Sequence, residues 1–178
     1  MSTFYIVEGV NLFCGDHDPT NSKHLTLAEL KLPDLTGIFA DHHPGGARVG
    51  VEFEVGIEKL QPTFKLNGYD PDLLVQFGLG SRVRHMYTGY GALVDKRTGA
   101  YVELKTVMEA RLGEVTPDAF QRGELMGHEY ALKELMHYEV HFNGSEKIYW
   151  DFFTNTWRVN GTDQNADVNR ILRISGAG

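Results

Sequence analysis

The stretch that decides the fold, residues 25–57, reads LTLAELKL, then PDLTGIFADHHPGGARVG, then VEFEVGI. Two segments with strand-like alternation flank a connection of roughly 18 residues, a length that in a compact domain is normally functional or disordered. Ile38 and Phe39 place apolar side chains at its centre, where a solvated linker needs none. We therefore predict a long assembly loop, residues 33–50, that reaches another subunit and serves assembly rather than chemistry.

The two flanking segments have different patterns. From residue 51 to 57 the odd-numbered positions are apolar, whereas Glu52, Glu54 and the following Glu58 are acidic. This alternation predicts a strand with one buried face and one acidic, solvated face. In residues 25–32 the apolar positions change from odd-numbered to even-numbered, which predicts a strand with a β-bulge or a change of sheet face near Glu29.

Most of the remaining chain also has the composition of strands. Strand-like segments are expected at residues 4–13, 64–66, 82–94, 102–112, 130–142 and 148–157. Turn signals at residues 95–99, Asn143-Gly144 and Asn160-Gly161 join several of them as hairpins. Residues 130–142 are ambiguous, because ALKELMHY has helical spacing while the longer alternation favours a strand, which we adopt.

Two short helices are expected. Asp70 can cap a helix over residues 70–78, Pro71 suits its first position, and Leu73, Leu74 and Phe77 form an apolar stripe. Gly78 or Gly80 can end it. A second helix is expected within residues 163–174, with Val168, Ile171 and Leu172 on one face, followed by frayed residues 175–178.

Together these patterns predict a mainly β protein. Strands joined by hairpins, without strand–helix–strand alternation, favour an antiparallel β-sandwich or barrel with one flanking α-helix and a short C-terminal helix. The chain of 178 residues is expected to form a single domain.

The composition limits the classes of function. A formal net charge of −7 argues against a dedicated nucleic-acid binder but not against a protein that lets DNA pass. The lone Cys14 excludes an internal disulfide framework and a multi-cysteine zinc site. The sequence has no signal-peptide pattern and no apolar run of membrane-spanning length, so we expect the protein in the cytoplasm or in a particle assembled there.

The candidates for chemistry are weak. Asp41, His42 and His43 are ligand types for zinc, but neighbours on an extended chain point in opposite directions, so a polar loop is the better interpretation. Cys14 near His17 lacks a third orienting residue, and packing explains it better than catalysis.

Other polar and aromatic groups do not change this conclusion. His137 and His141 share a strand face with Glu139 between them, where a ligand pair is one interpretation and a solvated face the preferred one. Aromatic residues at 149–157 suit packing better than base stacking, because little positive charge accompanies them. We predict no catalytic residues, no metal and no cofactor, and hence no enzyme.

The ordered set of motifs resembles the major tail tube protein of contractile-tailed bacteriophages, and related tubes of phage-tail-like bacteriocins and type VI secretion systems. The features that match run from VNLF at residues 10–13 to WRVNG at residues 157–161 and on to about Leu172. Between them lie the LTLxxL element, Pro44-Gly45-Gly46, the acidic strand, the short helix and Asn143-Gly144. The sequence differs from the family's more basic pattern at Asp41-His42-His43.

The resemblance implies a structural virion protein. Hexameric rings would join their strands into one barrel and stack into the inner tail tube, through which DNA passes during ejection. The implied partners are the protein itself, a tail sheath protein, a tape-measure protein and DNA without sequence-specific binding in the lumen, and baseplate and tail terminator proteins, with no membrane. The implied location is the virion tail, assembled in the host cytoplasm.

Site residues follow from this model as hypotheses. The ring-stacking loop would use Ile38, Phe39, His42, His43 and Arg48. The lumen would be lined by acidic residues that weaken contact with the phosphate backbone, namely Glu52, Glu54, Glu58, Glu103 and Glu109.

Two other functions compete with the tube. A monomeric β-barrel that binds a small ligand or carbohydrate would carry a defined apolar pocket, and a metal-dependent enzyme would use His42 and His43. A tube protein from a bacteriocin or a type VI secretion system is a third alternative.

Overall fold

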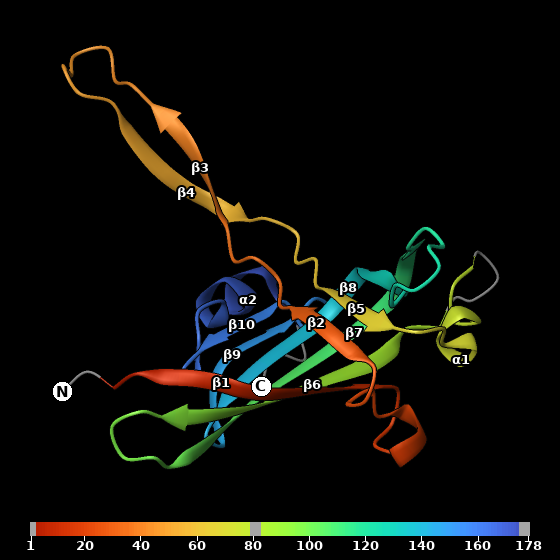
Figure 1. Cartoon of the computed structure of the whole chain (residues 1–178). Coiled ribbons are helices and arrows are strands. Elements are labelled where there is room, and N and C mark those ends of the chain that lie inside the picture. Colours follow the sequence, from red (N-terminus) through yellow and green to blue (C-terminus); the bar gives the residue numbers. More distant parts are fainter. Residues whose placement is uncertain (1–2, 79–82, 175–178) are drawn as a thin grey trace.

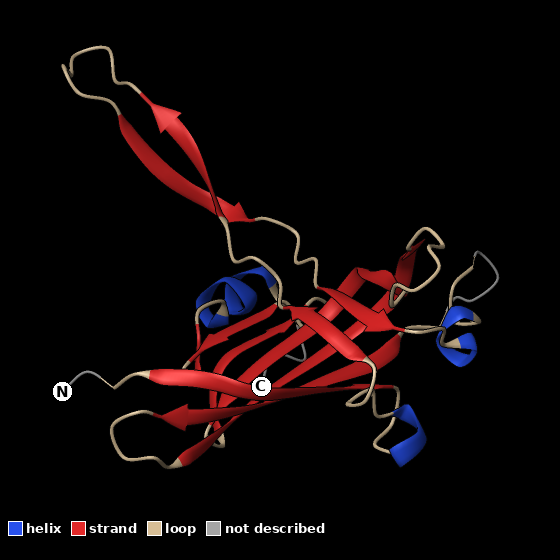
Figure 2. Ribbon diagram, viewed as in Figure 1, coloured by secondary structure: helices blue, strands red, loops and turns tan. Residues whose placement is uncertain are grey.

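The computed structural model describes residues 3–78 and 83–174. It shows a body formed by one large antiparallel sheet, and an arm that projects from it as a separate two-stranded hairpin (Figure 1). The arm consists of β3 (Gly37–His42) and β4 (Val51–Ile57). Strands dominate the described residues, as Figure 2 shows, so the predicted mainly β fold is confirmed.

The main sheet of the body follows a simple order with one branch. Its strands run β1–β6–β7–β8–β9–β10–β11, and a branch leads from β8 through β5 to β2. The long strand β8 pairs with β5 along its first part and with β9 along its last part. The strand bounds are β1 (Tyr5–Cys14), β2 (Leu27–Lys31), β5 (Thr63–Asn67), β6 (His85–Asp95), β7 (Tyr101–Pro117), β8 (Gly127–Phe142), β9 (Ser145–Asp151), β10 (Thr156–Val159) and β11 (Thr162–Asp163).

The branch folds back over the sheet and gives the body a barrel-like shape. The Lys23 backbone N–H donates to the Leu12 carbonyl at 2.9 Å, which brings the chain before β2 against the end of β1. The enclosed space is filled by the side chains that alternate inward. Phe64 and Tyr130 stack there with ring centroids 5.0 Å apart, and Tyr87 and Leu132 are fully buried beside them.

The predicted turns are confirmed and explain the antiparallel order. Asn143 and Gly144 have φ values of 50° and 75°, as a two-residue hairpin between β8 and β9 requires. At the β6–β7 turn the Gly99 N–H donates to the Asp95 carbonyl at 2.7 Å. The bulge near Glu29 is also present, because the β2–β5 register shifts between Leu27 and Glu29.

The first helix begins as predicted and is shorter than expected. In α1 (Pro71–Leu74) the Asp70 carboxylate accepts from the Leu73 N–H at 3.0 Å. Leu73 is buried, but Phe77 lies beyond the helix and is 51% exposed, so the predicted apolar stripe is wrong there. Gly80 and Arg82 lie outside the described residues.

The second helix forms within the predicted range, and its apolar face points to solvent. In α2 (Ala166–Leu172) the predicted stripe of Val168, Ile171 and Leu172 is exposed, and the buried residue is Asn169. Asn169 faces inward because its side-chain oxygen accepts from Asn155 at 2.7 Å. The remaining helical turn, η1 (Pro19–Asn21), lies in the loop after β1. The predicted fraying of residues 175–178 concerns residues outside the described part.

The arm corrects the prediction for residues 33–57 in two ways. Part of the expected loop is a strand, because residues 37–42 pair with residues 51–57, so the irregular tip is limited to residues 43–50. The face of β4 that was expected to be buried is exposed, with Phe53 58% and Val55 63% accessible. The reason is that β4 finds its partner strand within its own hairpin, which points away from the body (Figure 1).

Candidate assembly surfaces

The arm is amphipathic although it has no core of its own. Asp41 lies opposite Glu52 in the β3–β4 register, and Ala40 lies opposite Phe53. Strand alternation therefore puts Asp41, Glu52 and Glu54 on one face, and the apolar odd-numbered residues of β4 on the other. An isolated hairpin is at best marginally stable in water, so this arm is expected to need a partner surface.

The residues assigned to ring stacking lie on the arm. Ile38 and Phe39 lie on β3, both substantially exposed, and His42, His43 and Arg48 are exposed at or near the tip. His42 approaches the Phe53 ring, with centroids 6.1 Å apart. No group of residues suited to hold a metal ion occurs within residues 3–78 and 83–174, so the chain there offers no closed site to the Asp41-His42-His43 segment.

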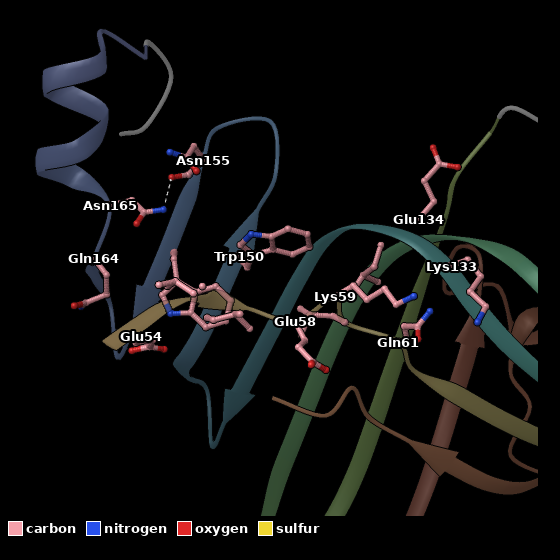
Figure 3. Close-up of a pocket in the computed structure, with 16 residues that line it drawn as sticks. Glu54, Glu58, Lys59, Gln61, Lys133, Glu134, Trp150, Asn155, Gln164 and Asn165 are labelled. Atoms are coloured by element: carbon pink, nitrogen blue, oxygen red, sulfur yellow. Dashed lines mark hydrogen bonds between the residues drawn. The ribbon is translucent and has the colours of Figure 1, made fainter. Parts of the chain in front are cut away.

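A wide groove separates the root of the arm from the body. It has a volume of about 1140 Å³ and runs between residues 54–61, the β8 segment at 133–135, and the start of α2. Partly buried Trp150 and Trp157 form apolar parts of its wall. Figure 3 shows Glu54, Gln164 and Asn165 toward one end of the groove, and Lys59, Gln61 and Lys133 toward the other.

The N-terminal part of β1 is a second exposed apolar region. Val7 is 51% and Val10 is 40% exposed, and both line a groove of about 200 Å³ with Leu30 and Leu104. Its floor includes Gly89, where a Cβ would lie 2.7 Å from the Thr106 hydroxyl oxygen. On the far side of β1 from β6, no described strand pairs with residues 5–10, so an open strand edge lies beside this groove.

The surface of the main sheet that faces away from the core includes Glu109, Glu139 and Glu146. We call it the polar face, and it carries paired charges. Glu109 on β7 binds Arg84 with an Oε1–Nε distance of 3.0 Å. Glu146 on β9 accepts two hydrogen bonds from Arg158 on β10, whose guanidinium lies 3.6 Å from the Tyr149 ring centroid. The Arg158 hydrogen bond is the main cause that lowers the pKa of Glu146 below its usual range.

Two histidines and two carboxylates form a continuous chain on this polar face. Glu139 holds the Nε2 atoms of His137 and His141, each at 2.7 Å from one of its carboxylate oxygens. The other ring nitrogen of His137, Nδ1, lies 3.2 Å from Asp151. Burial by itself raises the pKa of Glu139 and of Asp151, but their hydrogen bonds outweigh it, and both pKa values are lowered.

The prediction that His137 and His141 share one face of a strand is therefore confirmed. Besides Glu139 on the same strand, His137 has a partner on the neighbouring strand β9, Asp151. His137 lies opposite Asp151 in the β8–β9 register, a pairing that the Asn143-Gly144 hairpin creates. The histidine–glutamate spacing was visible in the sequence. The link to Asp151 depends on the register and was missed.

Cys14 and His17 do not form a reactive pair. Cys14 is 2% exposed, and burial raises the pKa of its thiol to about 12, which leaves it protonated at neutral pH. His17 instead bonds the Tyr90 hydroxyl at 2.9 Å. Packing is thus the role of Cys14.

The five glutamates expected in a lumen are divided between two parts of the molecule. Glu52 and Glu54 lie on β4 of the arm, with Glu58 just after it, and all three are exposed. Glu103 and Glu109 lie on β7 and point to the polar face of the body. The structure does not bring the two sets together within one subunit.

The chain belongs to the phage tail tube family. Its sequence matches the family model described as phage tail tube protein FII over residues 8–172. Comparison with curated proteins finds no significant match. No helix among the described residues is long and apolar enough to cross a membrane.

Solved structures with the same fold come from contractile injection systems. One is the PVC sheath–tube complex of an extracellular contractile injection system in the extended state, with a TM-score of 0.52 and 10% identity, covering 72% of this chain and 86% of that chain. The sheath/tube terminator of that system has a TM-score of 0.52 at 11% identity, covering 74% and 94%. The anti-feeding prophage baseplate, 6-fold symmetrised, gives 0.51 at 13% identity, covering 79% and 94%.

Proposed function

We propose that this chain forms stacked hexameric rings that build the inner tube of a contractile tail, through which DNA passes during ejection. The observation that carries the proposal is the arm, which exposes large apolar residues on a hairpin that its own body does not cover. Exposed apolar area of this kind marks a protein interface. Membership of the tail tube family makes other copies of this chain the natural partners.

Within a ring, the edges of the main sheet supply the lateral contacts. The N-terminal part of β1 is open on one side of the sheet, and β10 with the short β11 ends the other side. Pairing the edge of one subunit with that of the next removes both edges and continues the sheet around the ring. The six-fold symmetry stated for the anti-feeding prophage baseplate supports a ring of six copies.

Between rings, the arm supplies the axial contacts. Its apolar face, with Phe53 and Val55, would pack on a neighbouring subunit, and its tip with His42, His43 and Arg48 would reach farthest. Repeating an identical head-to-tail contact that does not close on itself produces a helical tube.

The polar face of the body is the natural lining of the lumen. Glu103 and Glu109 lie there, and paired carboxylates among its cations keep it from presenting a continuous positive surface to phosphate. Glu52, Glu54 and Glu58 would join this lining only where arms of neighbouring rings reach the lumen.

The proposed partners are those of a tail. A sheath protein would surround the tube, and baseplate and tail terminator proteins would cover its ends, by analogy with the sheath–tube, terminator and baseplate complexes of the similar structures. A tape-measure protein and then DNA would occupy the lumen, and the particle would assemble in the host cytoplasm. We propose neither an enzymatic activity nor a cofactor.

Deleting residues 39–49 tests the assembly role of the arm. The body keeps its complete core, so we expect a folded monomer or single ring that does not elongate, measured by circular dichroism, size-exclusion chromatography and negative-stain microscopy. Tubes of normal length from this variant would show that the arm is not the stacking element.

Paired charge reversals test which glutamates line the lumen. Glu103→Lys with Glu109→Lys and, separately, Glu52→Lys with Glu54→Lys should each be assembled into particles and compared for the rate of DNA ejection. A lumen-facing pair slows ejection while tubes still form. Unchanged ejection with normal tubes removes that pair from the lining.

A small-ligand binding protein is the second candidate, and the wide groove at the arm root is the observation that favours it. A chain that stays monomeric at high concentration, with neither rings nor tubes by microscopy, would support that alternative.

A further inference from the structure

The two histidines of the polar face differ in how many of their ring nitrogens are engaged. His137 has a carboxylate oxygen at each nitrogen, Glu139 Oε1 at 2.7 Å and Asp151 Oδ2 at 3.2 Å. His141 has a carboxylate at Nε2, where Glu139 Oε2 lies 2.7 Å away. Because a carboxylate is only an acceptor when ionised, the protonation of each ring follows from this geometry.

His137 can satisfy both contacts only as an imidazolium. In a neutral ring one nitrogen carries a lone pair, and that lone pair would face a carboxylate oxygen without a proton between them. The alternative, a protonated carboxyl, conflicts with the surroundings of Asp151, whose Oδ1 already accepts from the Thr154 N–H at 2.9 Å and from the Thr154 hydroxyl at 3.0 Å. The pKa values of Asp151 and Glu139 are both lowered, which keeps both groups ionised at neutral pH.

We propose that His137 is an imidazolium that clamps strand β9 to strand β8, because it donates from Nε2 to Glu139 of β8 and from Nδ1 to Asp151 of β9. His141 donates from Nε2 to the other oxygen of Glu139, which its neutral ring can do. The two histidines therefore make different contacts on one strand.

The position of His137 explains what the clamp holds. His137 and Asp151 form the last pair of the β8–β9 ladder, next to the turn at residues 152–155. Glu134, three residues before His137, has a φ of 50°, which marks a distortion of β8 at the same place. The ion pair thus joins two strands where regular pairing ends, and Asp151 at the same time caps the turn through Thr154.

The surroundings of the cluster contain charges that are largely balanced. Opposite His137 and His141 on β7 lie Glu109, which binds Arg84, and Lys105. On β9 the facing groups are Asp151, Tyr149 and Glu146, and Glu146 is held by Arg158 of β10. With His137 as an imidazolium, the linked groups Asp151, His137 and Glu139 carry a net charge of −1.

One consequence rests on the proposed tube function. If the polar face lines the lumen, the His137 imidazolium cancels the charge of one of its two carboxylate partners in each subunit, and the lining is less repulsive to the phosphate backbone than the carboxylates alone would make it. The protonation states themselves are independent of assembly, so they are tested separately.

Long-range ¹H–¹⁵N spectra of the histidine rings test the proposal, in solution for a monomer or by magic-angle spinning for tubes. At pH 7 we expect both nitrogens of His137 protonated. His141 should show a protonated Nε2, the nitrogen that lies 2.7 Å from Glu139. A single protonated nitrogen on His137 at pH 7 overturns the clamp, and an unprotonated Nε2 on His141 overturns the contact assigned to that ring.

Two substitutions complete the test. Asp151→Asn removes the charge but keeps the shape, so His137 should lose one ring proton at pH 7, whereas Glu103→Gln on the same face should leave both rings unchanged. An unchanged His137 in Asp151→Asn overturns the assignment. Should Asp151→Asn fail to fold, the spectra of the unmodified chain still decide, because they report both protonation states directly. Absence of rings in microscopy removes only the lumen consequence.

Discussion

The arm and the body are made of strands with similar alternation, yet only the body buries its apolar residues. Phe64 on β5 is 2% exposed, whereas Phe53 on β4 is 58% exposed. The two aromatic side chains stand in comparable strand patterns, but β5 pairs with β2 and β8 in the sheet of the body, whereas β4 pairs only with β3. The difference teaches that an amphipathic strand needs a surface to cover its apolar face, but that its sequence does not say whether this surface belongs to the same chain.

The largest expected effect separates the two regions by stability. Phe64→Ala should cost about 3–5 kcal/mol of unfolding free energy, because it leaves a cavity beside the stacked Tyr130 ring. Phe53→Ala should change the stability of the unassembled chain by less than about 0.5 kcal/mol, as for an exposed residue. Urea unfolding at low protein concentration measures both, and equal losses would mean that the arm is folded onto the body in solution.

The next effect appears when assembly is measured in place of stability, because the substitution in the arm is then expected to be the more harmful one. Phe53→Ala should weaken the contact between subunits by about 2 kcal/mol, as truncation of a buried aromatic anchor does, and so raise the protein concentration needed for tubes roughly 30-fold. Sedimentation of tubes over a concentration series gives this threshold. The exposed Phe120→Ala, in the loop after β7, serves as the matched control. An unchanged threshold in Phe53→Ala would exclude its side chain from the interface.

Acidification should destabilise the body of the molecule. The pKa values of Glu139, Asp151 and Glu146 on the body are lowered, so their contribution to stability is complete above the ordinary values of 4.5 for Glu and 3.8 for Asp. It is lost as the pH falls through the lowered values.

Thermal melting between pH 6 and pH 3 checks this prediction for the body. Glu139→Gln should flatten the acid limb of the profile relative to the unmodified chain, and Glu103→Gln on the same face should not. An acid limb that is identical in all three proteins would show that the histidine–carboxylate chain does not contribute to acid sensitivity.

The smallest expected effect concerns the acidic face of the arm. Asp41→Asn removes one of two like charges that lie directly opposite each other and should stabilise the hairpin by about 0.2–1 kcal/mol. Hydrogen exchange of the β3–β4 amides measures the change, with Asp34→Asn, before the arm, as the control. Slower exchange is expected in Asp41→Asn, and faster exchange would indicate that Asp41 binds a cation within the arm.

The sequence by itself determined the features that depend on a few neighbouring residues. Asn143-Gly144 forms its turn because these residues tolerate positive φ, Asp70 caps α1 because its carboxylate reaches the Leu73 N–H, and the phase shift near Glu29 produces a bulge. The order of such local signals was also sufficient for the resemblance to tail tube proteins, which the family match confirms.

Only the tertiary structure decided the features that depend on which segments meet. Residues 37–42 became a strand because residues 51–57 offered an edge, and the apolar face of β4 stayed exposed because the hairpin leaves the body. His137 met Asp151 because of the hairpin register, and α2 turned Asn169 inward because Asn155 bonds it. Alternation and helical spacing report that a face is apolar, while the location of its partner is a property of the whole fold.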